Sequence, residues 1–217
     1  PPSEQAFREQ LRRRRAHDLK AAREGDKAAY ALEEFYGRLE RTTPRHGERP
    51  FEIGHIDHTE LDLQFVGSRR GEKLGRARLT LFIDAFTRMI LAWVVMFDEP
   101  SYRSCMMVIR ECVKRHGRIP KYIVVDKGPE FEGQYFETLL ARLESHKKTR
   151  PGSKPRFGSV IERLFGISNQ EFVHDLEGHS QALQKPRSLS KGHDPRRRAS
   201  WTLREFTVAF EGYLVQL

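Results

Sequence analysis

Apolar and polar residues alternate along residues 51–66 with the two-residue period that is typical of β-strands. Residues 77–86 and 89–98 are two apolar runs rich in β-forming residues, which also predict strands. A polar loop with turn residues, 67–75, separates the first two of these stretches, and the short Thr87-Arg88 turn joins the last two as a hairpin. This part of the chain therefore predicts a meander of three antiparallel strands.

Helices and short strands are expected to alternate after the meander. The apolar spacing predicts a helix at 101–117, a strand at 121–125, a helix at 132–146, a short strand at 147–149 and a long helix at 159–178. Gly117 is a typical residue at a helix C-terminus. An antiparallel meander followed by helix-linked strands is typical of the α/β class, so we expect a mixed five-stranded sheet with helices on both faces.

Further helices are predicted on both sides of this core. Residues 3–40 are rich in Ala, Leu, Glu and Arg, with a break at Gly25-Asp26. At the other end, Thr202 and Glu205 fit a capping box that opens a helix. We therefore expect an N-terminal helical segment with a linker at 1–50, a core at 51–177, and a basic loop with a C-terminal helix at 178–217.

The net charge of the chain indicates which class of molecule it binds. Its 217 residues contain 39 Lys and Arg against 30 Asp and Glu, which gives a net charge of +9 and a pI near 9.8. This balance predicts a polyanionic partner, and nucleic acid is the commonest one. No run of about eighteen apolar residues occurs, so we expect no membrane segment. The chain begins Pro-Pro without Met, which indicates a fragment.

Cysteine and histidine give no sign of a structural metal site. Cys105 and Cys112 lie seven residues apart in one helical pattern, which predicts two buried core thiols in a reducing compartment. The nine histidines include no paired His/Cys cluster of the kind that binds structural zinc.

Carboxylates near the ends of predicted elements indicate a different metal chemistry. Asp57 lies in the first strand, Asp126 ends the fourth, and Glu162 opens the long helix, with 35 residues between Asp126 and Glu162. If the first and fourth strands are neighbours, the two aspartates lie side by side, and a helix over that edge could bring Glu162 to them. Three oxygen ligands suit Mg²⁺ or Mn²⁺. Two such ions about 4 Å apart stabilise both the attacking and the leaving oxygen of a phosphoryl transfer.

Each carboxylate also has a structural interpretation. Asp126 precedes Lys-Gly-Pro and could begin a turn, and Asp57 could be a polar residue on a half-exposed strand. Ser159 and Glu162 fit a capping box, so Glu162 could be a helix cap instead of a ligand. Asp84 is a further acidic candidate, but its position fits the turn of the hairpin better than a metal site.

Four motifs in order decide between these interpretations: HIDHTELDL, LTLFIDAFTRMILAWVV, IVVDKGPEF and GSVIERLFGISNQEF. Together with the 35-residue gap they resemble the catalytic core of DDE transposases and retroviral integrases, and they are closest to the bacterial TnsB/TniA and Mu-like transposases. The resemblance covers residues 51–176 and implies an RNase H-like fold. It also implies that Asp57, Asp126 and Glu162 are the catalytic triad and bind two Mg²⁺ ions, with Mn²⁺ as a substitute.

One departure from the family concerns Lys127, where Asn is usual. Its ammonium group could contact a DNA phosphate, or it could compete with a metal ion for Asp126. Further DNA contacts are predicted at six other basic or polar residues: Lys154, Arg156, Asn169, Arg196, Arg197 and Arg198.

The resemblance implies that the chain is an enzyme, the catalytic-core fragment of a DNA transposase. Water would hydrolyse a phosphodiester at the transposon end, and the freed 3′-OH would attack target DNA in the same site. Self-assembly into a multimer on transposon-end and target DNA, an AAA+ ATPase partner and a bacterial cytoplasmic, nucleoid-associated location are also implied. Two rivals stay open: a nuclease or resolvase of the same fold that only hydrolyses, and a non-catalytic DNA-binding assembly module.

Overall fold

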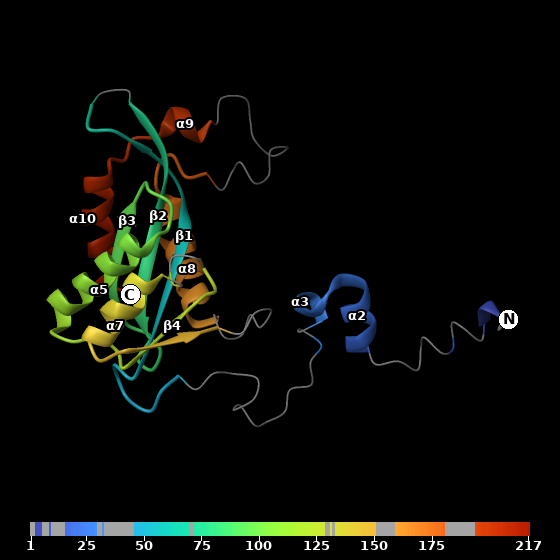
Figure 1. Cartoon of the computed structure of the whole chain (residues 1–217). Coiled ribbons are helices and arrows are strands. Elements are labelled where there is room, and N and C mark those ends of the chain that lie inside the picture. Colours follow the sequence, from blue (N-terminus) through green and yellow to red (C-terminus); the bar gives the residue numbers. More distant parts are fainter. Residues whose placement is uncertain are drawn as a thin grey trace. The chain divides into compact units, whose positions relative to one another are not determined.

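The structure, a computed structural model, describes residues 3–5, 9, 16–29, 32, 46–69, 72–128, 131, 133–150, 159–180 and 194–217. The chain divides into two compact units: residues 1–45 with 150–159, and residues 46–149 with 160–217. The second unit contains the whole sheet (Figure 1). The C-terminal segment, for which a separate region was predicted, thus belongs to the same compact unit as the core.

The first unit contains two short helices on either side of a glycine. α2 (Ala16–Glu24) and α3 (Asp26–Ala29) are separated by Gly25, whose φ of 87° lies in the left-handed region that glycine tolerates. The predicted break at this position is confirmed. The rest of the predicted N-terminal helix, apart from residues 3–5, 9 and 32, lies outside the described residues.

The sheet of the second unit has five strands: β1 (Ile53–Val66), β2 (Lys73–Asp84), β3 (Ile90–Met96), β4 (Tyr122–Val125) and β5 (His146–Thr149). Their order across the sheet is β3-β2-β1-β4-β5. The β1–β2 and β2–β3 pairs are antiparallel, whereas β1–β4 and β4–β5 are parallel. The prediction of a mixed five-stranded sheet is confirmed, and β1 lies at its centre.

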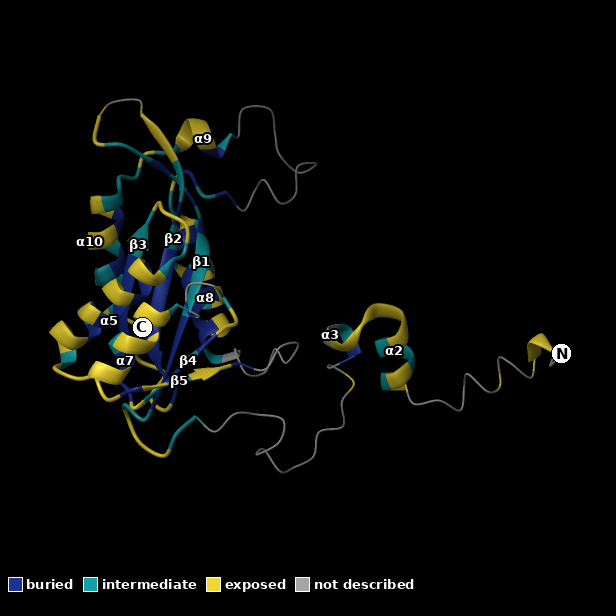
Figure 2. Ribbon diagram, in the orientation of Figure 1, coloured by how far each residue is buried: buried dark blue, intermediate teal, exposed yellow. Residues whose placement is uncertain are grey.

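Helices cover both faces of this sheet, as predicted. One core lies beneath α5 (Tyr102–His116) and α7 (Gln134–Arg142), and it includes both buried thiols, Cys105 and Cys112. The other core lies beneath α8 (Ser159–Glu171) and α10 (Leu203–Leu214). Figure 2 shows the buried strands between these helices, whose outer surfaces are exposed. None of the helices in the described part of the chain has the length and apolar character needed to cross a bilayer.

Local signals in the sequence set several helix ends. Gly117 ends α5 in the left-handed conformation, with a φ of 68°. At the start of α10, the Thr202 side chain accepts from the backbone N–H of Glu205, and the Glu205 carboxylate accepts from the N–H of Thr202 at 2.9 Å. The predicted capping box is therefore complete. Glu211 then ties α10 to β3 and α5, because it accepts from Trp93 Nε1 at 3.0 Å and pairs with Arg115 at 2.9 Å.

Several predicted boundaries differ from the structure, including that of the helix predicted at 132–146, which is α7 and ends at Arg142. The long helix predicted to reach residue 178 ends at Glu171, and a 3₁₀ turn, η3 (Val173–Asp175), follows it. The helix ends there because Phe172 leaves the helical conformation and stacks on Tyr213 of α10, with 5.1 Å between ring centroids. The loop predicted to reach residue 75 ends earlier, since β2 begins at Lys73.

A further correction concerns the basic cluster, which was predicted to lie in irregular chain. Pro195–Arg198 form one helical turn, α9, and the Asp194 carboxylate accepts from the backbone N–H of Arg196 at its start. Aspartate as the capping residue followed by proline is a helix-start signal that the sequence already contained.

Candidate active site

The pairing of β1 with β4 sets the geometry of the predicted site. The two strands are parallel neighbours, with His55 opposite Val124. Asp57 lies two residues after His55, and Asp126 lies two residues after Val124 and directly follows the last residue of β4. The strand pairing ends at His55 and Val124, so it assigns the two aspartates to the same end of neighbouring strands, where we expect their carboxylates to lie close together.

Both aspartates are assigned to the same face of the sheet. Asp57 lies opposite Leu81 of β2, and Leu81 is buried in the core beneath α8 and α10. Residues directly opposite in a sheet share a face, so Asp57 is on the α8 side. Val125 is buried in the other core, and strand alternation therefore assigns Asp126 to the α8 side as well. Asp57 is half-buried and Asp126 is exposed, so solvent and ligands can reach this edge.

Glu162 lies in the first turn of α8, the helix that covers this face. Ile161 and Phe165 on either side of it are buried against the sheet, whereas Glu162 itself is exposed. Within the described ranges, no three His, Cys, Asp or Glu side chains gather closely enough to hold a metal ion. Asp57, Asp126 and Glu162, all within those ranges, therefore do not form such a group in this structure. The side chain of Ser159 lies outside the description, so the capping box there stays a prediction.

The outer face of α8 is open around its glycine. A Cβ atom built on Gly166 would meet no described atom beyond its own helix within 4 Å, so packing inside the protein does not explain this residue. Glu162 and Asn169 lie on the same side of the helix as Gly166 by their spacing. A large ligand can thus approach α8 closely along this side.

The apolar residues of α8 and the phenylalanine that follows it lie in the core. Leu164 and Phe165 are buried beneath the helix, and Phe172 packs against the rings of Phe206 and Phe210. These side chains hold α8 against the sheet and are not available to stack on DNA bases.

A histidine that the sequence interpretation missed lies beside the aspartates. His58 Nδ1 is 2.8 Å from Thr80 Oγ1, and Nε2 is 3.8 Å from the sulfur of Cys105. Its ring stacks on Phe131, in the segment that follows Asp126, with 5.5 Å between centroids. One side chain therefore contacts β2, α5 and the segment after β4. No sequence pattern around His58 indicates this role, because its partners are distant along the chain.

The environment of His58 keeps its imidazole neutral. Burial lowers the pKa of His58 to about 4, the positive charge of Arg78 lowers it too, and Asp126 acts in the opposite direction. The backbone N–H of His58 donates to Asp57 Oδ1 at 2.8 Å, which restrains the Asp57 carboxylate. His58 thus orders the edge that carries the aspartates without adding a charge to it at neutral pH.

Asp84 is a structural residue, as the sequence predicted. Its side chain is fully buried, and its oxygens accept from the backbone N–H of Phe51 at 2.8 Å and from the N–H and hydroxyl of Thr87, both at 2.7 Å. The carboxylate therefore closes the β2–β3 turn and fixes Phe51, whose φ of 61° is unusual for a residue with a side chain.

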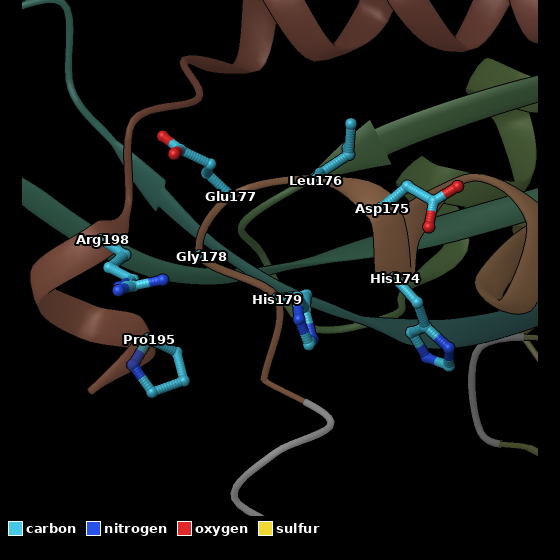
Figure 3. A pocket seen from close by; sticks show the side chains of 8 residues that line it. All are labelled: His174, Asp175, Leu176, Glu177, Gly178, His179, Pro195 and Arg198. Atoms are coloured by element: carbon cyan, nitrogen blue, oxygen red, sulfur yellow. The ribbon is translucent and has the colours of Figure 1, made fainter. Parts of the chain in front are cut away.

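Several basic residues that were predicted to contact DNA lie on the surface of this unit. Lys127 and the α9 arginines Arg196, Arg197 and Arg198 are exposed. Arg198 lines a cavity of about 200 Å³ together with His174 and His179, while the carboxylates of Asp175 and Glu177 point away from the two imidazoles (Figure 3). Lys154 and Arg156, predicted as DNA contacts, lie outside the described residues.

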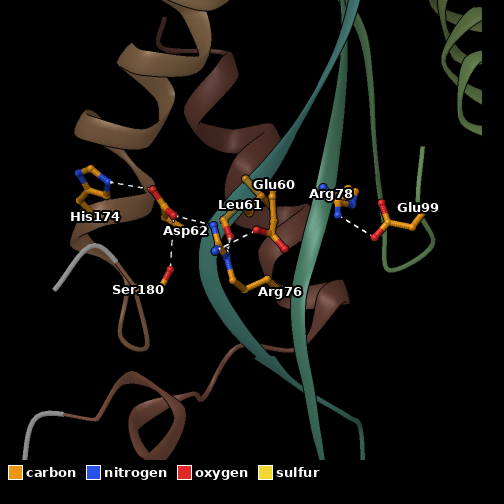
Figure 4. A network of polar contacts seen from close by, with 8 residues as sticks. All are labelled: Glu60, Leu61, Asp62, Arg76, Arg78, Glu99, His174 and Ser180. Carbon is orange, nitrogen blue, oxygen red and sulfur yellow. Dashed lines mark hydrogen bonds and ion pairs between the residues drawn. The ribbon is translucent and has the colours of Figure 1, made fainter. Parts of the chain in front are cut away.

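A polar network fixes the segment that follows α8. Asp62 of β1 accepts from Arg76 Nη2 at 2.7 Å and from Ser180 Oγ at 3.4 Å, and His174 Nε2 lies 4.0 Å from the same carboxylate (Figure 4). Arg76 also pairs with Glu60 at 2.9 Å. The C-terminal end of α8 is therefore anchored to the centre of the sheet, at the opposite end of the helix from Glu162.

Comparison with known proteins agrees with this architecture. Residues 55–178 match the model of the family described as the TnsB C-terminal domain. The chain is 27% identical over 142 residues to the transposase for transposon Tn552 of Staphylococcus aureus, and 26% identical over 172 residues to the Tn7 transposition protein TnsB of Escherichia coli. These matches cover 62% and 70% of this chain but only 29% and 24% of the two relatives. The chain thus spans about a quarter of their length.

A solved structure shares the fold. The simian T-cell lymphotropic virus intasome in complex with the PP2A regulatory subunit B56 gamma superposes with a TM-score of 0.50, over 87% of this chain and 64% of the compared chain. The sequence identity is 17%, so the likeness concerns the fold alone.

Proposed function

Because the chain belongs to the TnsB C-terminal domain family, a DDE transposase and integrase catalytic core, we propose that it carries out metal-dependent DNA 3′-end cleavage and strand transfer. The reaction class is phosphoryl transfer between polynucleotides. Water would hydrolyse a phosphodiester at the transposon end, and the 3′-OH that remains would attack a phosphodiester of the target DNA.

One observation carries this proposal. β1 and β4 are parallel neighbours, and Asp57 and Asp126 each lie two residues beyond the last pair of their register, His55 and Val124. Glu162 lies in the first turn of α8, which covers one face of this sheet. The carboxyl ends of parallel strands are where open α/β sheets bind their ligands. Asp84, by contrast, is buried and hydrogen-bonded, so it does not compete for this role.

The residues at this edge fit a hard divalent cation. Asp57 and Asp126 offer carboxylate oxygens from two rigid strands, and Glu162 offers a third from the end of a helix. We propose that these three side chains hold two Mg²⁺ ions, or Mn²⁺ in their place. When bound, such ions neutralise the charge that develops on the attacking and leaving oxygens of the phosphodiester.

The residues of the protein are proposed to position the metal-binding carboxylates and the DNA. His58 holds β1, α5 and the segment after β4 in one arrangement, so the two aspartates are pre-ordered. Lys127, Lys154, Arg156, Asn169 and the α9 arginines are proposed to contact the DNA backbone and to orient the reacting phosphodiester. The open side of α8 at Gly166 leaves room for that DNA.

The partners proposed are those of a transposition reaction. They are transposon-end DNA, target DNA, further copies of the protein and, by family resemblance alone, an AAA+ ATPase. A bacterial cytoplasmic, nucleoid-associated location follows from the same proposal.

Strand transfer by a Glu162→Gln variant tests the proposed function. Gln can serve in a capping box nearly as Glu does, so the free energy of unfolding should change by about 1 kcal/mol or less. A neutral amide is a poor ligand for a divalent cation, so cleavage and strand transfer should fall by orders of magnitude. The assay uses a protein extended to include end-binding domains, and it measures melting temperature and joining of a free 3′-OH on the same preparation.

Glu205→Gln is the matched control, because Glu205 occupies the capping position of α10 and is remote from the carboxylate edge. It should alter stability slightly and leave strand transfer unchanged. If Glu162→Gln keeps its activity and loses stability, Glu162 is a cap and the triad assignment is wrong.

The open arrangement of the three carboxylates favours one alternative, a non-catalytic assembly module that binds DNA without cutting it. Such a protein would bind Mn²⁺ no more tightly than its Asp126→Asn variant. A nuclease or resolvase of the same fold is a further alternative, and it would hydrolyse DNA without joining a free 3′-OH to a target.

A further inference from the structure

Two exposed tyrosines form a stack on the surface of the α5–α7 layer. Tyr102 lies at the start of α5 and Tyr135 near the start of α7, and their rings stack with 5.9 Å between centroids and 27° between planes. Tyr102 is 41% exposed and Tyr135 is 75% exposed. Both rings face solvent, so packing in the protein core does not explain why large aromatic residues occur here.

Tyr102 and Tyr135 are close in sequence to the residues that contact His58. Tyr102 precedes Cys105 by one helical turn, and Cys105 contacts His58. Tyr135 is adjacent to Phe136, whose ring packs on Phe131 at 5.6 Å, and Phe131 stacks on His58. Each tyrosine is thus close in sequence to a residue of the cluster around His58, the histidine that follows Asp57. The tyrosine pair lies on the α5–α7 side of the sheet, and α7, which carries Tyr135, follows Asp126 in the chain.

The charges around the pair suit a nucleic acid. Arg103 is exposed next to Tyr102, and a hydrogen bond with the Tyr102 side chain raises the pKa of its guanidinium. Two acidic side chains of the same region are already paired, Glu99 with Arg78 and Glu137 with Lys147. Met106, 40% exposed one turn after Tyr102, extends the apolar surface.

We propose that Tyr102, Tyr135 and Arg103 form a stacking platform for an unpaired DNA base beside the active site, an inference that rests on the proposed function. Bases within a duplex are stacked on their own neighbours, so only a base that is unpaired or turned out of the helix can lie on the Tyr135 ring. Aromatic side chains bind single-stranded DNA in this way with little regard to sequence, and a nearby guanidinium adds contacts to the base or the phosphate.

The test uses this chain and a short single-stranded oligonucleotide that carries a fluorescent adenine analogue. Binding should quench the fluorescence of the analogue, because the base stacks on a tyrosine. Replacing both residues, Tyr102→Ala with Tyr135→Ala, should weaken binding about ten-fold and remove most of the quenching. The double Tyr→Phe variant keeps both rings and should behave like the wild type. A duplex of the same sequence should lose much less affinity in the alanine variant.

Phe86→Ala is the matched control, because Phe86 is also an exposed aromatic residue, at 47%, but lies in the β2–β3 turn. It should leave the binding of the oligonucleotide unchanged. The proposal is overturned if the double alanine variant binds and quenches like the wild type, or if Phe86→Ala causes an equal loss. It is also overturned if the alanine changes only dissolve a dimer of the chain in sedimentation while binding of the oligonucleotide persists.

These outcomes are separable from failure of the proposed function. If Glu162→Gln abolishes strand transfer and the tyrosine variants bind normally, the platform alone is wrong. If the tyrosine variants lose the oligonucleotide but no carboxylate change affects catalysis, the platform stands and the proposed function is wrong.

Discussion

Asp84 and Asp126 occupy similar positions in the sequence, each at the end of an apolar strand, yet their surroundings differ completely. Asp84 is fully buried, and its two oxygens accept two hydrogen bonds from Thr87 of the turn that they close and one from the backbone N–H of Phe51. Asp126 is exposed and directly follows β4, the neighbour of the strand that carries Asp57. A buried carboxylate whose oxygens accept hydrogen bonds inside the protein stabilises the fold, whereas a carboxylate at an exposed strand end can be reached by a cation. The comparison predicts opposite results of substitution at the two sites.

The largest effect is expected at the exposed aspartate. Asp126→Asn should lower strand transfer about a thousand-fold, because a bound cation contributes several kcal/mol of charge stabilisation to the transition state. Its free energy of unfolding should stay within about 0.5 kcal/mol of the wild type, as is usual for exposed positions. Activity assays and urea unfolding of one preparation measure both. Strand transfer near the wild-type rate would remove Asp126 from the site.

Asp84→Ala should give the reverse pattern. It removes the acceptor of the backbone N–H groups of half-buried Phe51 and exposed Thr87, and an unpaired buried donor costs about 1–3 kcal/mol, so we expect a loss of about 2 kcal/mol. Urea unfolding should show a lower midpoint with an unchanged slope. The Mn²⁺ affinity of the folded variant should equal that of the wild type, and a large fall in this affinity would contradict the structural role of Asp84.

The contrast between these aspartates shows what the sequence could predict. Asp84 was assigned to the hairpin turn because the turn lies next to it in the chain, and the capping box of Thr202 and Glu205 was found for the same local reason. Both features depend on near neighbours in sequence. The adjacency of β1 and β4 was only a condition of the site prediction, and the structure meets that condition.

The features that were missed depend on tertiary contacts. Nothing in the sequence around His58 indicates that Phe131 and Cys105 lie against it, and the end of α8 at Glu171 is set by packing of Phe172 on α10. The position of Glu162 relative to the aspartates also depends on how the first turn of α8 sits over the sheet. Motif spacing identifies this residue but does not fix that distance.

The buried thiol of Cys112 predicts how the free energy of unfolding changes with pH. Burial raises the pKa of Cys112 from 9.0 to about 12, so the thiol stays neutral in the folded protein while it ionises in the unfolded chain above pH 9. The stabilising contribution is therefore complete below pH 9 and is lost as the pH rises toward 12. At about pH 10 the unfolding free energy should have fallen by about 1 kcal/mol more than in Cys112→Ala. Equal slopes against pH in the two proteins would contradict this.

The smallest effect is expected at Lys127, next to the exposed aspartate. Lys127→Asn removes a positive charge that repels cations, so the affinity for Mn²⁺ should rise by about five-fold, equivalent to about 1 kcal/mol in water. If Lys127 also contacts a phosphate, the slope of log affinity for DNA against log salt should become shallower by about 0.9. Lys121→Asn is the control, because Lys121 is exposed at the other end of β4. An equal change in both variants would mean that only net charge matters.

The most direct test of the central claim is a crystal structure of the chain with Mn²⁺, in which anomalous scattering locates the ion. The account predicts a peak bound by Asp57 and Asp126, with the first turn of α8 moved so that the Glu162 carboxylate joins them. No peak should occur at Asp84. A peak elsewhere, or none between Asp57 and Asp126 at saturating Mn²⁺, would contradict the assignment of these carboxylates as a metal-binding active site.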